Sequence, residues 1–173
     1  MKKTSSLMFA LAFLGFSATA SAEPGDYVNA QLAIADVDGF SDGTAIVATY
    51  GIPMPHIDKH FSTEAEFTTT LTDPDTSVAG INVDASYFTL AGYAVYTYPV
   101  NEKFDLRGRA GLLYEDVDVS ASAVGVKASD DDFGLSFGFG VTYDIGKRMN
   151  VIAEYTVIES DITHLSAGIQ YTF

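Results

Sequence analysis

Two side chains near the end of the chain have the types needed for nucleophilic catalysis. His164 and Ser166 are separated by one residue, and a serine becomes a nucleophile when a histidine takes its proton and an acid orients that histidine. Only seven residues follow Ser166, and none of them is acidic. In an extended chain both side chains point to the same side, which is the interior of the architecture predicted below. We therefore expect no catalytic residues and no enzymatic activity.

A second candidate is a metal site around two histidines. His56 and His60 flank Asp58, and histidines four residues apart share a face on an α-helix. Pro53 and Pro55 precede them and disfavour a helix, so a solvated turn is the better interpretation. The chain has no cysteine, which excludes disulfides and thiolate ligands. We expect no metal site and no cofactor.

The charge of the chain limits its partners. Without Lys2 and Lys3 there are 7 basic and 23 acidic residues, a formal charge of −16. This charge repels phosphate backbones and argues against nucleic acid. Thirteen acids gather in segments that we interpret as loops, opposed by a single Lys127. Weak association of divalent cations with these carboxylates competes there with ordinary solvation. These acids are Asp36, Asp38, Asp42, Asp73, Asp75, Glu115, Asp116, Asp118, Asp130, Asp131, Asp132, Glu159 and Asp161.

The first 22 residues have the features of a secretory signal peptide. Lys2 and Lys3 form a basic start, Leu7 to Phe16 is almost wholly apolar, and Ala20-Ser21-Ala22 offers a cleavage site between small residues. The apolar part is too short to span a bilayer, and no later stretch approaches the roughly 18 apolar residues of a spanning helix. We predict cleavage after Ala22 and one mature domain over residues 23–173, which must use strands if it crosses a membrane.

Alternating apolar and polar side chains predict eight amphipathic strands in this domain. In residues 133–143, large apolar side chains occupy every odd position and glycine, serine or threonine every even one. Segments rich in proline, glycine and aspartate separate the strands. The predicted strands are residues 26–35, 44–52, 61–71, 85–98, 104–115, 133–143, 150–158 and 162–173.

The number and polarity of these strands indicate a membrane barrel. An even number of strands of about 9 to 12 residues, with short turns alternating with longer loops, fits a small outer-membrane barrel. A soluble barrel would show the same alternation with its apolar face inside. The glycine-rich and serine-rich face is small enough to fill a narrow lumen, whereas the phenylalanine-rich face is not. We predict an all-β, eight-stranded antiparallel up-and-down transmembrane β-barrel with residues 36–43, 72–82 and 116–131 outside the cell.

Five charged residues occupy strand positions whose side chains point into the predicted barrel. They lie on three outward-running strands at similar heights, given a rise of ~3.3 Å per residue. We predict that they meet as one ion-paired cluster, because unpaired charges in a dry lumen would be costly. Separate hydration of each charge in a wet lumen is the alternative. The cluster consists of Glu64, Glu66, Arg107, Arg109 and Glu154.

Residues 87–96, 104–111 and 165–173 resemble the eight-stranded outer-membrane β-barrel family that includes the OmpA transmembrane domain, OmpX and Ail. The resemblance implies an outer-membrane location in a Gram-negative bacterium, in contact with lipid and lipopolysaccharide. It also implies that periplasmic chaperones deliver the chain and that the insertion machinery reads Tyr171 and Phe173 as an assembly signal. His164-Leu165-Ser166 resembles the His-x-Ser of lipid A deacylases, but the orienting acid is missing after it.

The resemblance specifies architecture better than activity. We expect an integral outer-membrane protein with a structural or surface-interaction role. A narrow, low-conductance pore is the first alternative, although side chains can fill the lumen of an eight-stranded barrel. An adhesin or ligand-binding surface protein is the second alternative, and its partner would bind the loops.

Overall fold

The computed structural model describes residues 22–37, 39, 41–73, 75–78, 81–121, 126–159 and 162–173. The predicted signal peptide lies outside these residues except for Ala22. Within the described part no helix is long and apolar enough to cross a membrane. The strands described there are β1 (Tyr27–Val37), β2 (Gly43–Pro53), β3 (Phe61–Thr72), β4 (Asp75–Val78), β5 (Ile81–Pro99), β6 (Phe104–Ala121), β7 (Val126–Gly146), β8 (Met149–Glu159) and β9 (Ile162–Thr172).

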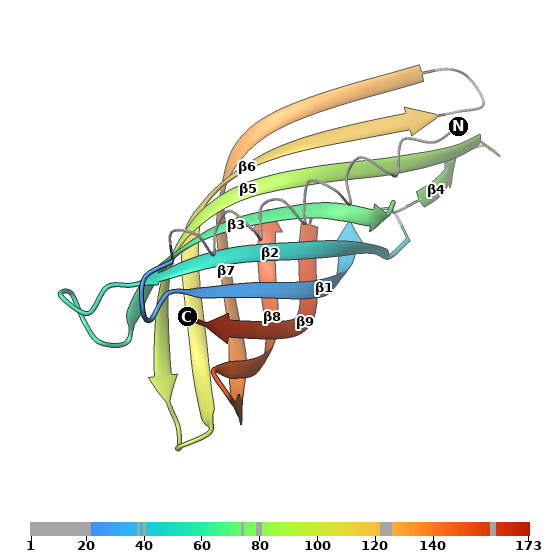
Figure 1. The fold of residues 1–173 in the computed structure, drawn as a ribbon. Helices are drawn as coiled ribbons and strands as arrows, with labels where there is room; N and C mark the ends of the chain where they lie inside the picture. Colours follow the sequence, from blue (N-terminus) through green and yellow to red (C-terminus); the bar gives the residue numbers. More distant parts are fainter. Residues whose placement is uncertain are drawn as a thin grey trace.

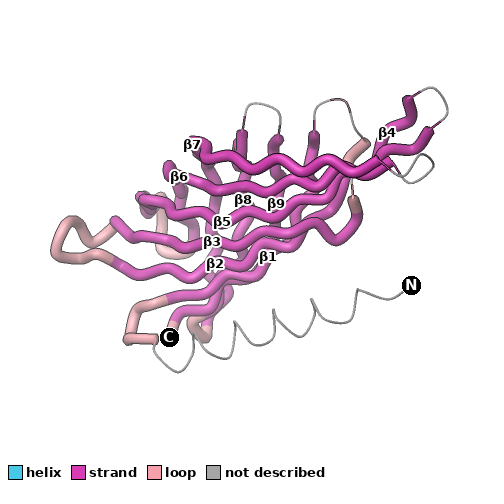
Figure 2. The backbone as a smooth tube through the Cα atoms, turned by 90° about the horizontal axis from the view of Figure 1, so that it is seen from above, coloured by secondary structure: helices cyan, strands magenta, loops and turns pink. Residues whose placement is uncertain are grey.

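Eight of these strands close into an antiparallel barrel. β1 pairs with β9, and β3 pairs with β5, which completes the ring. β4 lies outside the ring because it pairs only with the start of β5. Short turns join β2 to β3, β5 to β6 and β7 to β8, as predicted. β4 and the adjoining parts of β5 and β6 project well beyond the end of β1 (Figures 1 and 2). The predicted fold class is confirmed.

The projecting strands correct two predicted loops. We expected loops at residues 72–82 and 116–131, but β4 and the start of β5 occupy most of the first segment, and the ends of β6 and β7 most of the second. β6 pairs with β7 as far as Ala121 opposite Val126. The prediction of a loop at residues 116–131 is wrong because acids alternate with valines after Glu115. β-Branched residues favour a strand even where every second position is charged.

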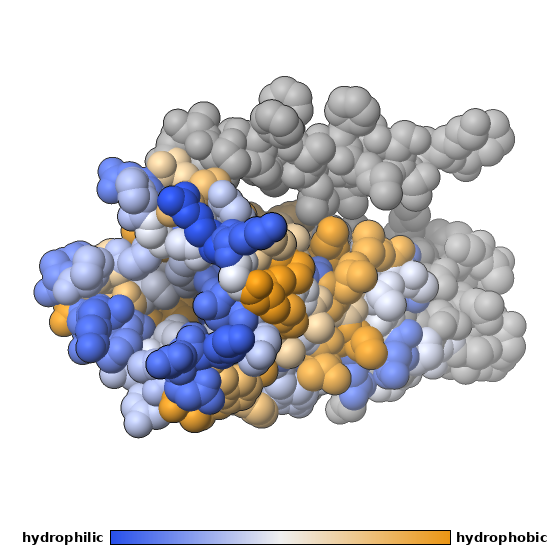
Figure 3. All heavy atoms as spheres, turned by 60° about the horizontal axis from the view of Figure 1, so that its bottom comes forward, coloured by the Kyte–Doolittle hydropathy of each residue, from blue (hydrophilic) through white to orange (hydrophobic). Residues whose placement is uncertain are grey.

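The outer surface is apolar and the interior is polar. On β7, Phe133 and Leu135 are 77 % and 75 % exposed on the outer surface, whereas Ser136 is 2 % exposed. Figure 3 shows apolar side chains across the middle of the visible face, and hydrophilic ones concentrated toward the end with the short turns. This is the sense expected of a barrel in a bilayer and the opposite of a soluble barrel.

Outward aromatic residues mark the two edges of the apolar band. Ring contacts join three neighbouring strands near the projecting end, with centroids 6.2 Å apart for Phe88 and Tyr114 and 5.1 Å apart for Tyr114 and Phe133. Each of these three residues has a second aromatic residue on the same strand, ten positions away toward the short turns. Ten residues span about 33 Å along a strand, or about 25 Å across the membrane at a tilt of about 40°, which matches the band of outer-membrane barrels. The pairs are Phe88 and Tyr98, Phe104 and Tyr114, and Phe133 and Tyr143.

Candidate functional site: the charged lumen

Strands β3, β6 and β8 bring five charged side chains to one level of the lumen. Glu64 and Glu66 come from β3, Arg107 and Arg109 from β6, and Glu154 from β8. The spacing of two residues keeps each pair on one face of its strand. All five side chains are between 0 and 4 % exposed, so the lumen is filled at this level.

These side chains form one network of ion pairs. Arg107 donates from Nη2 to Glu64 Oε1 at 2.6 Å and from Nε to Glu154 Oε1 at 3.2 Å. Arg109 donates to both oxygens of Glu66. Its Nη1 also lies 3.9 Å from Glu64 Oε2 and 3.8 Å from Glu154 Oε2. Glu64 and Glu154 thus link the two guanidinium groups, and the structure brings together all five residues that the sequence assigns to the cluster.

Neutral side chains that the sequence did not single out donate further hydrogen bonds to two of the carboxylates from the opposite wall of the barrel. Tyr27 OH donates to Glu64 Oε1 at 2.7 Å, and Gln31 Nε2 donates to Glu154 Oε2 at 2.9 Å. Both donors lie on β1. The alternation of side chains along β1 could have placed Tyr27 and Gln31 in the lumen. It gives no information about which interior side chains contact each other.

Arg109 has two further neutral partners. It donates from Nη2 to Thr156 Oγ1 at 2.6 Å, and its guanidinium carbon lies 4.3 Å from the centre of the Tyr93 ring. A planar guanidinium can make in-plane hydrogen bonds while it stacks on an aromatic face. The network is therefore specific for arginine at this position.

Two interior glycines provide the space for these large side chains. A Cβ atom at Gly140 would lie 2.5 Å from Glu154 Cγ, and one at Gly51 would lie 2.1 Å from the Tyr27 ring. Glycine within a strand commonly marks such close approaches. Gly140, which belongs to the small interior face predicted from the sequence, thus helps to seat the charged cluster.

A second layer, which is apolar, closes the lumen toward the projecting strands. Leu113 and Ile158 are each 1 % exposed in this layer. Tyr87 belongs to it and reaches from β5 to β9, where its hydroxyl lies 2.5 Å from His164 Nε2. The full layer is Ala35, Tyr87, Leu113, Ile158 and Ile162.

His164 and Ser166 both point into the lumen, as their parity predicts, but they have different partners. His164 contacts Tyr87, whereas Ser166 Oγ donates to Gln31 Oε1 at 2.8 Å. Both side chains are buried. Each is therefore engaged away from the other, and the arrangement is a structural brace between strands.

The turn histidines are fixed by local contacts. His60 N donates to Asp58 Oδ1 at 2.8 Å, and the His60 ring packs edge-on against Tyr96. His56 is exposed in the same turn. Among the residues that the structure describes, no group of three or more His, Cys, Asp or Glu side chains is arranged to hold a metal ion.

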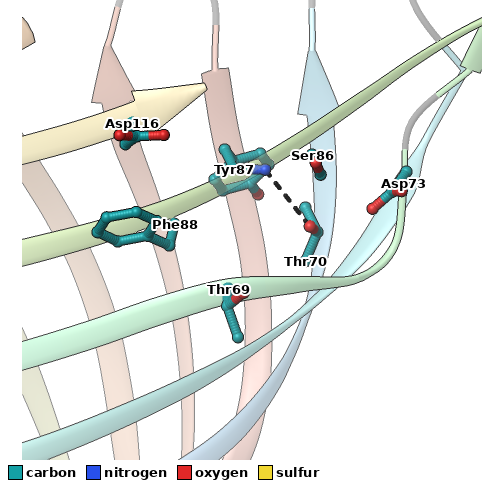
Figure 4. A pocket seen from close by; sticks show the side chains of 7 residues that line it. All are labelled: Thr69, Thr70, Asp73, Ser86, Tyr87, Phe88 and Asp116. Carbon is teal, nitrogen blue, oxygen red and sulfur yellow. Dashed lines mark hydrogen bonds between the residues drawn. The ribbon is translucent and has the colours of Figure 1, made fainter. Parts of the chain in front are cut away.

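A shallow pocket lies where β3 separates from β5. The β3–β5 ladder ends at Thr69 opposite Phe88. Just beyond it, Thr70 Oγ1 accepts a hydrogen bond from Tyr87 N (Figure 4). The pocket has a volume of about 250 Å³, and its hydroxyls, carboxylates and rings together specify no particular ligand. Its lining is Thr69, Thr70, Asp73, Ser86, Tyr87, Phe88 and Asp116.

The last residues of the chain help to close the barrel. Phe173 N donates to Asp26 O at 2.8 Å, and Gly25 N donates to Phe173 O at 3.1 Å. The rings of Tyr171 and Phe173 contact each other edge to face, with centroids 5.4 Å apart. The residues predicted to form the assembly signal thus lie at the rim, where β9 meets the start of β1.

A closed eight-stranded barrel with an apolar outer band, aromatic edges and a filled polar lumen defines the class of outer-membrane β-barrels. The family model for the outer membrane protein beta-barrel domain matches residues 7–173, and the chain belongs to this family. It is therefore a protein of the Gram-negative outer membrane, as the sequence predicts.

Solved structures share this fold at low sequence identity. Neisserial surface protein A is 18 % identical, with a TM-score of 0.67 over 86 % of this chain and 97 % of its own. The N-terminal barrel of Pseudomonas aeruginosa OprF is 10 % identical, with a TM-score of 0.61 over 87 % and 100 %. Yersinia pestis Ail, solved with the heparin analogue sucrose octasulfate, is 19 % identical, with a TM-score of 0.56 over 86 % and 97 %. No curated protein sequence matches the chain.

Proposed function

We propose that the chain is a non-conducting and non-enzymatic barrel with a structural or surface-interaction role. The filled lumen is the observation that carries this proposal. A pore needs a continuous path for water, but the ion-paired layer and the apolar layer lie in series along this barrel. Their packing supports an anchor in the membrane and disfavours the alternative of a narrow pore.

The positions of the candidate catalytic groups support the absence of enzymatic activity. His164 is buried against Tyr87, and Ser166 is buried against Gln31. A hydrolase would need the histidine beside the serine hydroxyl and both groups accessible to substrate. In this proposal the buried polar side chains stabilise the barrel, and no cofactor takes part.

The projecting strands support a role at the cell surface. β6 and β7 have 18 and 21 residues, about twice the 9–11 residues that a transmembrane strand needs. The surplus lies beyond the aromatic edge at Phe133, so it serves no purpose in crossing the bilayer. In this proposal lipid and lipopolysaccharide surround the band, the insertion machinery recognises Tyr171 and Phe173, and divalent cations associate only weakly with the external acids.

Conductance in planar bilayers tests the anchor proposal against the pore. We expect the refolded wild-type barrel to give no unitary current steps, whereas Arg107→Ala combined with Arg109→Ala opens the charged layer and raises the leak. Lys59→Ala combined with Lys103→Ala, which removes two positive charges from exposed turns, is the matched control. Reproducible unitary steps from the wild type would establish the narrow pore.

Binding to cells or matrix tests the surface role separately. Replacing residues 118–129 by a two-residue turn would join Val117 to Asp130, which are opposite each other in the β6–β7 ladder. We expect this variant to form a heat-modifiable barrel and to lose surface interactions. A variant with the turn at residues 54–59 replaced at the other end of the barrel should keep them. Unchanged binding by the shortened hairpin would refute the surface role of these strands.

A further inference from the structure

A tight turn precedes β1 at the seam where the barrel closes. Asp26 N donates to Glu23 O at 3.0 Å, which closes a turn over Glu23, Pro24, Gly25 and Asp26. Proline restricts the second position of this turn, and Gly25 takes the third position with a φ of 104°, the arrangement typical of a type II β-turn. The sequence Glu-Pro-Gly-Asp therefore fixes the position of Glu23 relative to Asp26.

This turn holds the end of the last strand. Gly25 N donates to Phe173 O at 3.1 Å, and Phe173 N donates to Asp26 O at 2.8 Å. The two bonds continue the ladder in which β1 pairs with β9. An interaction that stabilises the turn therefore also stabilises the seam between the first and the last strand of the barrel.

The carboxylate of Asp26 is buried at this seam, with the residue 6 % exposed. Its Oδ2 accepts hydrogen bonds from Glu23 N at 2.9 Å and from the hydroxyl of Tyr50 on β2. Within the part of the chain that the structure describes, no lysine or arginine side chain forms an ion pair with it. An ionised carboxylate that is buried without a counter-ion is destabilising, so this position calls for a positive charge.

The predicted removal of the signal peptide creates such a charge at the right atom. In the precursor, Glu23 N is an amide nitrogen. Hydrolysis of the peptide bond between Ala22 and Glu23 consumes one water, leaves a carboxylate on Ala22 and converts Glu23 N into an α-amino group. An α-amino group is mostly protonated at neutral pH. The nitrogen that lies 2.9 Å from Asp26 Oδ2 then carries a positive charge, and a hydrogen bond between two charged groups is stronger than one from a neutral amide.

We infer that the new amino terminus and Asp26 form a latch on the barrel seam, which removal of the signal peptide completes. The Glu23 ammonium is the counter-ion of Asp26, and the Tyr50 hydroxyl orients the carboxylate from β2. The precursor retains the amide hydrogen bond but lacks the charge, so its seam opens more easily. Cleavage after Ala22 is a premise of this inference, whereas the anchor and surface roles proposed above are not.

Acetylation of the amino terminus tests the charge alone. The mature barrel that starts at Glu23 is compared with the same barrel acetylated selectively at Glu23 N, which keeps an N–H but cannot be protonated. Both are refolded in detergent micelles, and mass spectrometry verifies a single acetyl group. We expect acetylation to lower the equilibrium constant for folding in urea about fivefold. Asp26→Asn keeps the size of the side chain and removes its charge, so most of this difference should disappear in that variant.

Hydrogen exchange of backbone amides locates the effect. The N–H groups of Gly25 and Phe173 should exchange about fivefold faster in the acetylated barrel, because both donate hydrogen bonds between the turn and the last strand. Asp144 N donates to Lys103 O at the same end of the barrel. Its N–H is the internal control, and its exchange rate should not change.

Three results would overturn the inference. A mature protein whose first residue is not Glu23 would place the ammonium at another atom. Equal stability and equal exchange of the free and acetylated barrels would show that the charge contributes nothing to the seam. An equal effect of acetylation in the Asp26→Asn barrel would assign the effect to another group.

Tyr50→Phe provides a second test that does not depend on the folding of Asp26→Asn. It keeps the ring and removes the other hydrogen-bond donor to the same carboxylate. The carboxylate then depends more on the ammonium, so acetylation should lower the folding constant further in this variant than in the wild type. The same effect of acetylation in both proteins would refute a shared carboxylate.

Discussion

Removal of Arg107 tests whether the lumen charges act as one coupled unit. Arg107→Ala deletes the hydrogen bonds to Glu64 at 2.6 Å and Glu154 at 3.2 Å. Three buried carboxylates then face the single guanidinium of Arg109. Loss of one partner of a buried ion pair costs about 3–5 kcal/mol. We expect the free energy of unfolding to fall by about this amount, and by less where water enters the lumen.

A double-mutant cycle separates the interaction energy of Arg107 and Glu64 from the other effects of each substitution on stability. A hydrogen bond to a charged group contributes about 1.5–3 kcal/mol, so Arg107→Ala with Glu64→Ala should be less destabilised than the sum of the single variants by about 2 kcal/mol. Arg107→Ala with Glu66→Ala is the control cycle, because Glu66 bonds to Arg109 instead. Its coupling energy should be smaller.

The measurement is urea unfolding in detergent micelles, followed by far-ultraviolet circular dichroism because the chain has no tryptophan. Single variants that lose well under 1 kcal/mol, together with additive effects in both cycles, would refute the plug. That result would mean that each charge is hydrated separately in a wet lumen. Equal coupling in both cycles would contradict the specific pairing, since it would assign the same energy to contacting and non-contacting residues.

Three further predictions concern space, assembly and topology. Gly140→Val should destabilise by about 1–3 kcal/mol through overpacking against the charged layer, whereas Gly108→Val, at a position open to the outside, should change urea unfolding little. Deletion of Phe173 should leave unfolded or degraded chains in the periplasm, and normal levels of heat-modifiable barrel would contradict this. Protease added to intact cells should cut within residues 116–131 and spare 53–59, and the reverse pattern would invert the orientation of the barrel.

Strand periodicity made the barrel predictable from sequence, since the side of a strand that a residue occupies follows from its position alone. The same rule assigned Arg107, Arg109 and their carboxylate partners to the interior. It could not identify Tyr27 or Gln31 as donors to those carboxylates, because they come from a strand on the far wall. That contact depends on the closure and register of the whole ring, which no local pattern contains.

Strand length was harder to predict than strand parity. Alternation identified β7 from Phe133, where large apolar residues begin, and missed the residues from Val126 to Asp132. A strand that leaves the membrane no longer needs an apolar face, so its hydrophobic alternation weakens although its backbone ladder continues. The acidic composition then resembles that of a loop. The ladder with β6 and not the side-chain pattern determines where this strand starts.

The two ends of these strands tolerate sequence change differently. In the lumen, Arg107 bonds to Glu64, Glu154 and Gln170, so a change at one residue leaves buried groups on three other strands without a partner. Beyond the apolar band, β6 and β7 are joined by backbone hydrogen bonds that many sequences can make. The projecting sheet can therefore change its surface without loss of the charged layer that stabilises the barrel. Such independence is what a membrane anchor for a surface-interaction module requires.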